Sequence, residues 1–437
     1  MNRLVIRNAG WLIVCRIIKA LLGAVVSVLT ARFLGPSNFG LVSYASSITA
    51  FFAPIVLLGF NSILVQELIF HREEEGKILG SAIWSTLACS LVGIALTTLS
   101  AAVIDPSDGD SIVVCGIFSI SLMFQATELI QYWFQAKYQS KTIALVGLLA
   151  YVLVSTYKIL LLALKVDVYW FALSNAFDYM IISTVLIILY WKGNNQPIRF
   201  SKPVFKRLFQ SGRYYIVSAL MIVVFAQTDK VMIKAMLGND QNGYYSAAVA
   251  CAAMTITFFS AVIEAMRPYI LEGKQKNEAV FEARLKALYM ILIWSALFSS
   301  LFFCVFSNLI VRLLYGPAYM GASKALRVVI WYTGLSCLGG AKDIWILAEG
   351  KQKNLLWLNS SGALLNIILN YYLIQRIGIV GAAISTLITQ FFSNFFLCFL
   401  VKDLRPNMYL LAEAANPLGL LNTLKRTAVA AKRNAKK

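Results

Sequence analysis

Long apolar runs recur from one end of the chain to the other and are separated by short polar stretches. Each run exceeds ~18 residues, the length that an α-helix needs to cross the ~30 Å apolar core of a bilayer. The pattern therefore predicts an all-α polytopic membrane protein with twelve transmembrane helices, at residues 9–32, 41–65, 78–104, 111–135, 142–164, 167–190, 214–237, 244–271, 287–314, 325–348, 355–374 and 379–401.

The connections between these runs are of two kinds, which alternate along the chain. One kind is short and almost free of basic residues, whereas the other carries Lys and Arg, as do both ends of the chain. The ends and the basic connections hold 26 of the 39 Lys and Arg residues, and the opposite connections hold 3: Lys165, Lys324 and Arg376. Because basic residues are retained on the cytoplasmic side, we expect both termini to be cytoplasmic. Arg16 and Lys19 interrupt the first run and no cleavage site follows it, so we expect a membrane helix there and not a signal peptide.

The longest polar connection lies at the midpoint of the chain and divides the runs into six and six. We expect a six-helix bundle at 1–191, a cytoplasmic linker at 192–213, a second six-helix bundle at 214–401 and a basic cytoplasmic tail at 402–437. The tail either lies against anionic lipid or stays in solvent.

A faint internal repeat relates the two halves. Leu34, Gly35, Gly40, Ser43 and Ala45 recur 203 residues later as Leu237, Gly238, Gly243, Ser246 and Ala248. A repeat in the same direction predicts bundles related by a pseudo-two-fold axis along the membrane normal. The alternative is that helical hairpins simply favour glycine, which adopts positive φ at little cost.

Composition excludes several classes of protein. Of the 437 residues 59% are hydrophobic and only 14% are charged, so a soluble enzyme, a disordered scaffold, a collagen-like fibre and a disulfide-rich secreted domain are all excluded. The net charge of +19 follows largely from the topology, and no nucleic acid is needed to explain it.

The sequence lacks the common motifs of ATPases, zinc proteases and serine hydrolases. It has no Walker A, HExxH or GxSxG motif, and its one histidine, His71, lies in a predicted cytoplasmic loop. The seven cysteines lie inside apolar runs without metal or redox spacing, so we expect no metal and no cofactor. The segment containing Asp105, Asp108 and Asp110 has the composition of a tight turn. It also has the Asp-x-Asp spacing with which a polytopic glycosyltransferase could hold a divalent ion.

Charged residues inside the predicted spans carry the functional argument. Five acids and ten bases lie there: Glu128, Asp178, Asp229, Glu264, Asp343, Arg16, Lys19, Arg32, Lys158, Lys230, Lys234, Arg267, Arg312, Arg327 and Lys342. A charge at mid-membrane costs ~2.5–3.5 kcal/mol, so such residues normally face a wet cavity or a partner. Arg32, Lys234, Arg312 and Arg327 lie near span ends, where reaching the interface is an equal alternative.

The surplus of positive charge inside the spans favours an anionic substrate. A cationic, low-dielectric cleft concentrates anions, and Arg and Lys are the residues that bind phosphate. We therefore expect a water-filled central cavity, with Arg16, Lys19, Lys158, Lys230, Arg267 and Lys342 as substrate-binding candidates. Buried ion pairs combined with side chains that reach the interface are the alternative explanation.

Five short segments resemble a known family. They are NAGWLIVCRIIKALLG (8–23), ARFLGPSNFGLVSYASS (31–47), QTDKVMIKAMLG (227–238), QNGYYSAA (241–248) and RIGIVGAAIST (376–386). The sequence resembles bacterial polysaccharide flippases of the O-antigen (Wzx) type, within the superfamily that also holds lipid II flippases and multidrug extruders.

The resemblance implies a non-enzymatic flippase with two six-helix bundles in the bacterial inner membrane. Its cargo would be an undecaprenyl-diphosphate-linked oligosaccharide, carried from the cytoplasmic to the periplasmic leaflet by alternating access. Basic residues of the first, seventh and eighth helices, here Arg16, Lys19, Lys230 and Arg267, would bind the diphosphate. A proton or sodium ion would couple transport, with Glu128, Asp178, Asp229 and Glu264 as candidates. Membrane lipids, a polymerase and chain-length proteins would be partners. A cation-coupled multidrug extruder and a polytopic polymerase or glycosyltransferase are the alternatives.

Overall fold

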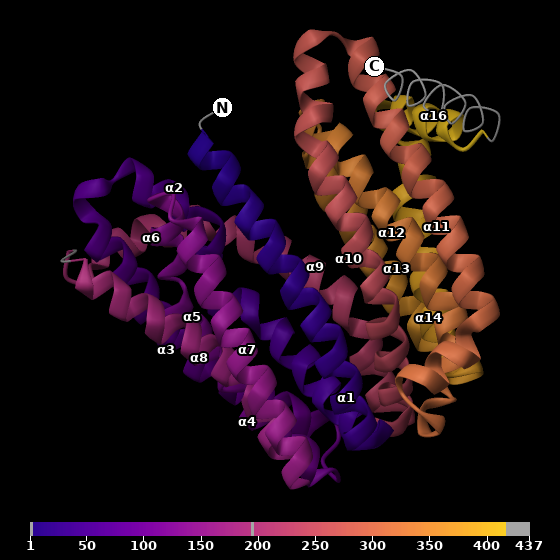
Figure 1. The fold of residues 1–437 in the computed structure, drawn as a ribbon, viewed down its shortest axis with the longest axis horizontal. Helices are drawn as coiled ribbons and strands as arrows, with labels where there is room; N and C mark the ends of the chain where they lie inside the picture. Colours follow the sequence, from indigo (N-terminus) through magenta and orange to yellow (C-terminus); the bar gives the residue numbers. More distant parts are fainter. Residues whose placement is uncertain (1–2, 194–195, 417–437) are drawn as a thin grey trace, which may run out of the picture. The chain divides into compact units, whose positions relative to one another are not determined.

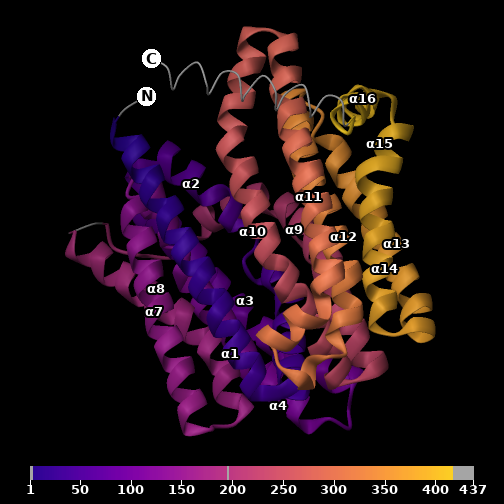
Figure 2. The same ribbon diagram turned by 45° about the vertical axis from the view of Figure 1, so that its right-hand side comes forward.

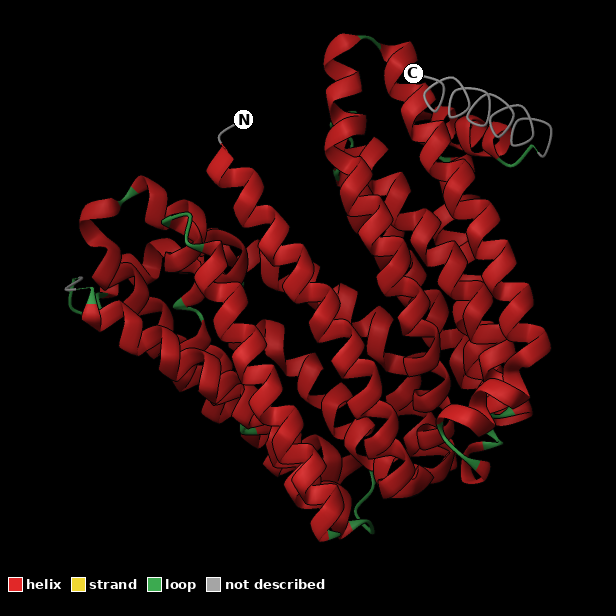
Figure 3. Ribbon diagram, viewed as in Figure 1, coloured by secondary structure: helices red, strands yellow, loops and turns green. Residues whose placement is uncertain are grey.

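A computed structural model describes residues 3–193 and 196–416, and every regular element in these residues is helical (Figure 3). The side chains of residues 3–14, 16 and 17 are not described, and the tail beyond 416 lies outside the described residues. The chain divides into two compact units, Met1–Ser246 and Ala247–Lys437 (Figures 1 and 2).

The first unit holds the helices up to the beginning of α10. They are α1 (Arg3–Val56), α2 (Phe60–Phe70), η1 (Arg72–Glu74), α3 (Glu75–Ile104), α4 (Gly109–Ser119), α5 (Ser121–Glu128), α6 (Gln131–Ala136), α7 (Ser140–Leu164), α8 (Val168–Lys192), α9 (Lys202–Leu237) and α10 (Asn239–Lys276). α1 packs against α3, α4, α7 and α9, and α8 packs against α5 and α7.

The second unit holds the rest of α10 and the helices that follow it. These are α11 (Glu278–Leu314), η2 (Pro317–Tyr319), α12 (Ala322–Ala348), α13 (Lys353–Ile377), α14 (Ile379–Phe391), η3 (Phe392–Phe396), α15 (Leu397–Leu400), η4 (Lys402–Leu404) and α16 (Arg405–Ala414). α12 packs against both α11 and α14, α13 packs against α14, and the short α16 packs against α11.

Nine stretches of the described residues are long and apolar enough to cross a membrane. They are Ile18–Phe70, Arg72–Ile104, Gly109–Ala136, Ser140–Leu164, Val168–Lys192, Lys202–Leu237, Asn239–Lys276, Glu278–Leu314 and Ile379–Leu400. The chain is therefore an all-helical polytopic membrane protein, as the sequence predicts. The first stretch, of 53 residues, covers two of the twelve predicted spans. α12 and α13 are helices at two further predicted spans, but they carry more polar residues.

The junction between the first two predicted spans lies within α1, which is kinked at Gly35 (φ 70°, ψ 174°). Gly238, the predicted repeat partner of Gly35, has φ 87° and ψ −178°, and Gly316 has φ 88° and ψ 177°. The three glycines share a backbone conformation that a residue with a Cβ adopts only under strain. The glycine turns of the repeat are therefore alike in conformation as well as in sequence.

The boundary between the compact units follows Ser246, whereas the sequence predicts a linker at 192–213. α9 explains the difference, because it packs along α1 and α3 and so belongs to the first unit. The helix also begins at Lys202, with Pro203 in its first turn, where the missing N–H of proline costs nothing. The division into two six-helix bundles stays a prediction.

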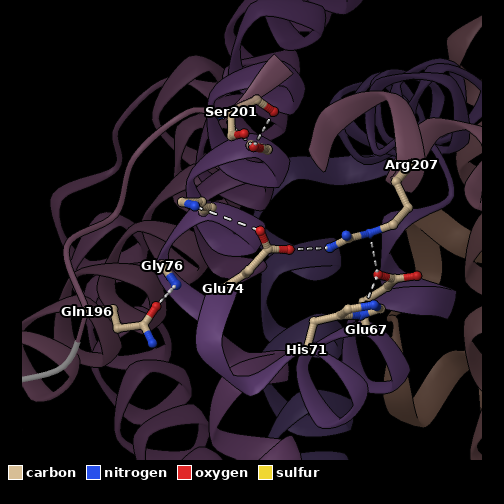
Figure 4. A network of polar contacts seen from close by, with 9 residues as sticks. Glu67, His71, Glu74, Gly76, Gln196, Ser201 and Arg207 are labelled. Carbon is tan, nitrogen blue, oxygen red and sulfur yellow. Dashed lines mark hydrogen bonds and ion pairs between the residues drawn. The ribbon is translucent and has the colours of Figure 1, made fainter. Parts of the chain in front are cut away.

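The extended segment 196–201 is bound to the start of α3 (Figure 4). Arg199 N donates to Gly76 O at 3.1 Å, and Ser201 N donates to Ser81 Oγ at 2.9 Å. A Cβ at Gly80 would lie 2.2 Å from Arg199 O, so only glycine allows this approach. At the start of α9, Arg207 forms ion pairs with Glu67 at 3.2 Å and Glu74 at 3.0 Å. These contacts hold the chain between α8 and α9 against the first unit.

Candidate functional site

A cavity of about 230 Å³ lies inside the first unit, and two of the predicted site residues line it. Lys19 reaches the cavity from α1 and Glu128 from the last residue of α5, with Gln131 of α6 and Gly147 of α7 beside them. Its other lining residues are mostly apolar, so the two ionisable groups and Gln131 supply its polar character. The structure therefore places an ammonium and a carboxyl group at one cavity within the membrane-spanning part of the chain.

The ammonium group of Lys19 lies beside α7, next to the aromatic ring of Tyr151 and the backbone of Gly147. Its Nζ lies 5.4 Å from the centroid of the Tyr151 ring, within the range of a cation–π interaction. The Cβ position of Gly147 lies 3.5 Å from the same Nζ, so the ammonium packs directly against α7. These neighbours orient the ammonium group without neutralising its charge.

Lys158 of α7 and Asp178 of α8 complete a group of four ionisable side chains. Asp178 interacts electrostatically with both Lys19 and Lys158, and Glu128 interacts with Asp178 and Lys19. None of the ion pairs between described residues joins these four directly, and the buried Oδ1 of Asp178 has no hydrogen-bond partner there. Two cations and two acids thus lie within Coulombic range of one another without contact.

The two site candidates on α9 lie in a separate polar environment. The buried Asp229 accepts a hydrogen bond from Tyr245 Oη at 2.5 Å. Lys230 Nζ lies 3.4 Å from Gln227 Oε1, which also accepts a hydrogen bond from Ser47 Oγ at 3.0 Å. Lys230 is half-buried and interacts electrostatically with Asp229 next to it in sequence.

Lys234 is buried and forms two ion pairs, which its position near the end of a predicted span does not indicate. Its side chain is 2% exposed, and its Nζ lies 2.7 Å from Asp105 Oδ2 and 2.8 Å from Asp108 Oδ2. Asn239 Nδ2 also donates to Asp108 Oδ2, at 3.0 Å. Of the two alternatives for Lys234, a partner or extension to the interface, the structure shows partners, because two carboxylates accept hydrogen bonds from its ammonium group.

The same contacts show what the aspartate-rich turn does. Asp108 Oδ1 accepts from Ser111 N at 3.0 Å and so caps α4, while Asp110 accepts from Tyr169 Oη at 2.7 Å. The hydrogen bond from Lys234 lowers the pKa of Asp105, and Ser107 lowers it further. Burial by itself would raise the pKa of Asp108, but hydrogen bonds from Lys234, Ser111 and Asn239 leave it lowered. The turn reading is confirmed, and a lysine occupies the oxygens that a metal-dependent glycosyltransferase would need.

In the second unit, Lys342 of α12 is buried, with 4% of its surface exposed. Its Nζ donates to Asn394 Oδ1 at 3.0 Å and lies 3.7 Å from Asp343 Oδ1. Asn394 belongs to η3, a π-helical turn in the last span, and it also donates to Gln390 Oε1 at 2.7 Å. Such turns often mark functional sites. Nothing in the sequence signals the π-helical turn, so Asn394 was missed.

Arg267 and Glu264, the two candidates on α10, are exposed in the second unit. Arg267 interacts electrostatically with Asp343. Of the ten candidates, the structure therefore gathers Lys19, Lys158, Glu128 and Asp178 at one site. The side chain of Arg16, one helical turn before Lys19, lies outside the described residues.

The fold is that of known membrane transporters. It is similar to the structure of lipid II flippase MurJ in an inward closed conformation, with a TM-score of 0.71 at 18% identity over 90% of this chain and 87% of that one. It is also similar to an inward-facing multidrug resistance MATE family transporter of the MOP superfamily, with a TM-score of 0.65 at 13% identity over 91% and 96%. The chain thus has the fold of this superfamily.

The family model described as polysaccharide biosynthesis protein matches residues 5–274, and the chain belongs to that family. The "Putative O-antigen transporter" of Shigella flexneri is 23% identical over 402 residues, which are 87% of this chain and 94% of that protein. The "Probable low-salt glycan biosynthesis flippase Agl15" of Haloferax volcanii is 27% identical over 232 residues, 49% of this chain and 46% of that protein.

The chain spans about half the length of two archaeal relatives, 46% and 51%, but nearly the whole of the Shigella protein. The relatives whose names state a role are named as a flippase and as transporters, and the family is one of transporters and flippases and not of enzymes. The resemblance stated from the short sequence segments is thereby confirmed at the level of the family.

Proposed function

We propose that this protein is a flippase that moves a polyprenyl-diphosphate-linked oligosaccharide, an O-antigen or similar repeat unit, from the cytoplasmic to the periplasmic leaflet. Its family membership and the O-antigen transporters that it matches over most of their length support this proposal. The carrier lipid would be undecaprenyl diphosphate, and transport would proceed by alternating access.

The observation that carries the proposal is the position of Lys19 at a cavity within the membrane-spanning part, beside Glu128 and Gln131. A diphosphate moves through the low-dielectric core only if cations replace its hydration shell, and lysine is a common phosphate ligand. Lys158 adds a second cation nearby. The proposed substrate-binding set is Arg16, Lys19, Lys158, Lys230, Arg267 and Lys342, whose members would meet the diphosphate in different states of the cycle.

The proposed architecture is that of twelve spans in two six-helix bundles, related by a pseudo-two-fold axis along the membrane normal. The alternation of basic and non-basic connections supports cytoplasmic termini in a bacterial inner membrane. Coupling to a proton or a sodium ion is proposed, with Glu128, Asp178, Asp229 and Glu264 as candidate carriers. Polymerase and chain-length proteins of the same pathway are the proposed partners.

A complementation assay tests the proposal in a strain that lacks its own flippase and whose surface polysaccharide depends on this chain. Lys19→Met keeps the length of the side chain and removes its charge, and we expect it to reduce surface polysaccharide at least tenfold with normal protein in the membrane. Lys165→Met, at the exposed turn between α7 and α8, is the matched control and keeps wild-type polymer. Wild-type polymer from Lys19→Met and Lys158→Met together would contradict the assigned cargo. Resistance to organic cations conferred by the wild-type chain would favour a multidrug extruder instead.

A further inference from the structure

Lys19 and Glu128, which line the cavity, share their charge partners with Lys158 and Asp178. Asp178 interacts with both lysines, and Lys19 interacts with both acids. In the described part of the chain these four groups have no direct ion pair, and Asp178 Oδ1 is buried without a hydrogen bond. Each carboxylate therefore depends on a lysine that it does not touch, and Lys19 and Glu128 lie at a cavity that a ligand can enter.

We propose that the diphosphate and the carboxylates of Glu128 and Asp178 compete for Lys19 and Lys158, so that binding of the cargo carries protons into the same cavity. This inference rests on the proposed function, because it takes the diphosphate as the ligand of the lysines. A phosphate oxygen that approaches Lys19 takes over the ammonium that had balanced the acids. The acids are then left beside an added negative charge in a poorly solvated space, and each relieves that cost by binding a proton.

Among the described residues, the other titratable groups that interact with the two acids are tyrosines and not cations. From α6 and α7, Tyr132 and Tyr151 interact with Glu128 and Asp178 respectively, and Tyr179 of α8 interacts with both acids. α3 packs against α5 and α4 packs against α8, and their charged residues lie at the beginning of each helix, at Glu75, Lys77 and Asp110. Arg16 precedes Lys19 by one turn, and its side chain is not described.

Protonation of the acids and binding of the diphosphate favour each other, and this affects the transport cycle. By reciprocity, a proton on either acid frees a lysine and strengthens binding of the diphosphate. Cargo and proton therefore bind together at this cavity and do not exclude each other. An ion that is exchanged against the cargo must bind elsewhere, which leaves Asp229 and Glu264 as the candidates for such an exchange.

Titration calorimetry of the purified full chain with farnesyl diphosphate tests the inference. Runs in buffers of different ionisation enthalpy give the number of protons taken up on binding, and the pH dependence of Kd gives the same number independently. We expect the Kd of the wild-type protein to rise up to about tenfold per pH unit for each linked proton. In Glu128→Gln with Asp178→Asn the protein's share of the uptake disappears, and binding at alkaline pH becomes tighter than in the wild-type protein.

Asp240→Asn, at an exposed carboxylate near the start of α10, is the matched control and keeps the wild-type proton count. The ligand's own protonation affects all variants equally, so differences between variants belong to the protein. The single substitutions, each expected to remove part of the uptake, serve if the double variant does not fold. Binding that depends on Lys19, with the same proton count in the acid variants and in the wild-type protein, would overturn the inference and leave the proposed function standing. Failure of the wild-type protein to bind farnesyl diphosphate at any pH would overturn both.

Discussion

Two glycines of the internal repeat pack face to face, and this contact makes a quantitative prediction. A Cβ at Gly40 would lie 2.0 Å from Asn239 O and 2.6 Å from Gly243 N, and a Cβ at Gly243 would lie 1.9 Å from Pro36 O. Ordinary contacts begin at 3.4 Å, so Gly40→Ala must separate the turns by more than an ångström. That movement also breaks the hydrogen bond from Asn242 Nδ2 to Gly40 O, now 2.7 Å long.

The expected cost of Gly40→Ala is about 1–3 kcal/mol for the overlap, with about 1 kcal/mol more for the lost hydrogen bond. At ~2–4 °C per kcal/mol for a unit of this size, Tm falls by several degrees. Thermal unfolding of the purified protein, followed by tryptophan fluorescence, measures the shift. Gly109→Ala is the matched control, because nothing lies within 4 Å of its Cβ position and its φ is unstrained. If Gly40→Ala melts with Gly109→Ala and the wild-type protein, the face-to-face packing of the turns is refuted.

Three further predictions concern the charged clusters and the segment that joins α8 to α9. Lys234→Met removes the cation between Asp105 and Asp108. Because these side chains are 29% and 21% exposed, we expect the free energy of unfolding to fall by about 2–4 kcal/mol. Breaking a fully buried pair costs ~3–5 kcal/mol. The loss should appear in Tm and be partly restored by Asp105→Asn with Asp108→Asn, and no restoration would count against the pairing. Since the pKa values of Asp105 and Asp108 are lowered in the folded protein, their contribution to stability is complete above the unfolded value of ~3.9 and is lost as the pH falls through the lower folded values. The Tm difference between wild type and the double Asn variant should thus be constant from about pH 5 to 8 and shrink only below about pH 4. Gly80→Ala drives a Cβ into Arg199 O, so trypsin should cleave after Arg199 faster than in the wild-type protein, with Gly109→Ala again as the control.

The sequence predicts the helices well because the bilayer imposes one strong constraint on them. Every predicted span lies on helical segments, although 41–65 is broken between α1 and α2 and 111–135 is divided among α4, α5 and α6. Gly35 and Gly238 of the glycine repeat share one positive-φ conformation. Helix ends outside the apolar core are set by other forces, which hydropathy does not report. α9 begins at Lys202 because Pro203 and the contacts of Arg207 stabilise its first turns, not because the segment is apolar.

The sequence does not predict which distant residues pair with the charged side chains. Lys234 and Asp105 are 129 residues apart, and no periodicity along one helix connects them. The same holds for Lys342 and Asn394, which are 52 residues apart and belong to α12 and to the π-helical turn η3. Spacing within one helix finds neighbours at three or four residues, whereas packing between helices brings together residues that share no spacing.

The surplus of basic residues over all the spans suggests that an anion is attracted by excess positive charge. The group around Lys19 is different, because its charges are balanced. Within the interacting group, the described cations Lys19 and Lys158 are matched by Glu128 and Asp178, so these four residues carry no surplus of their own. A balanced cluster binds a diphosphate only by replacing one set of anionic partners with another. The affinity then depends on the protonation of Glu128 and Asp178 as much as on the lysines. A site of this kind binds its cargo less tightly when the acids ionise, and a purely cationic pocket would not respond in this way.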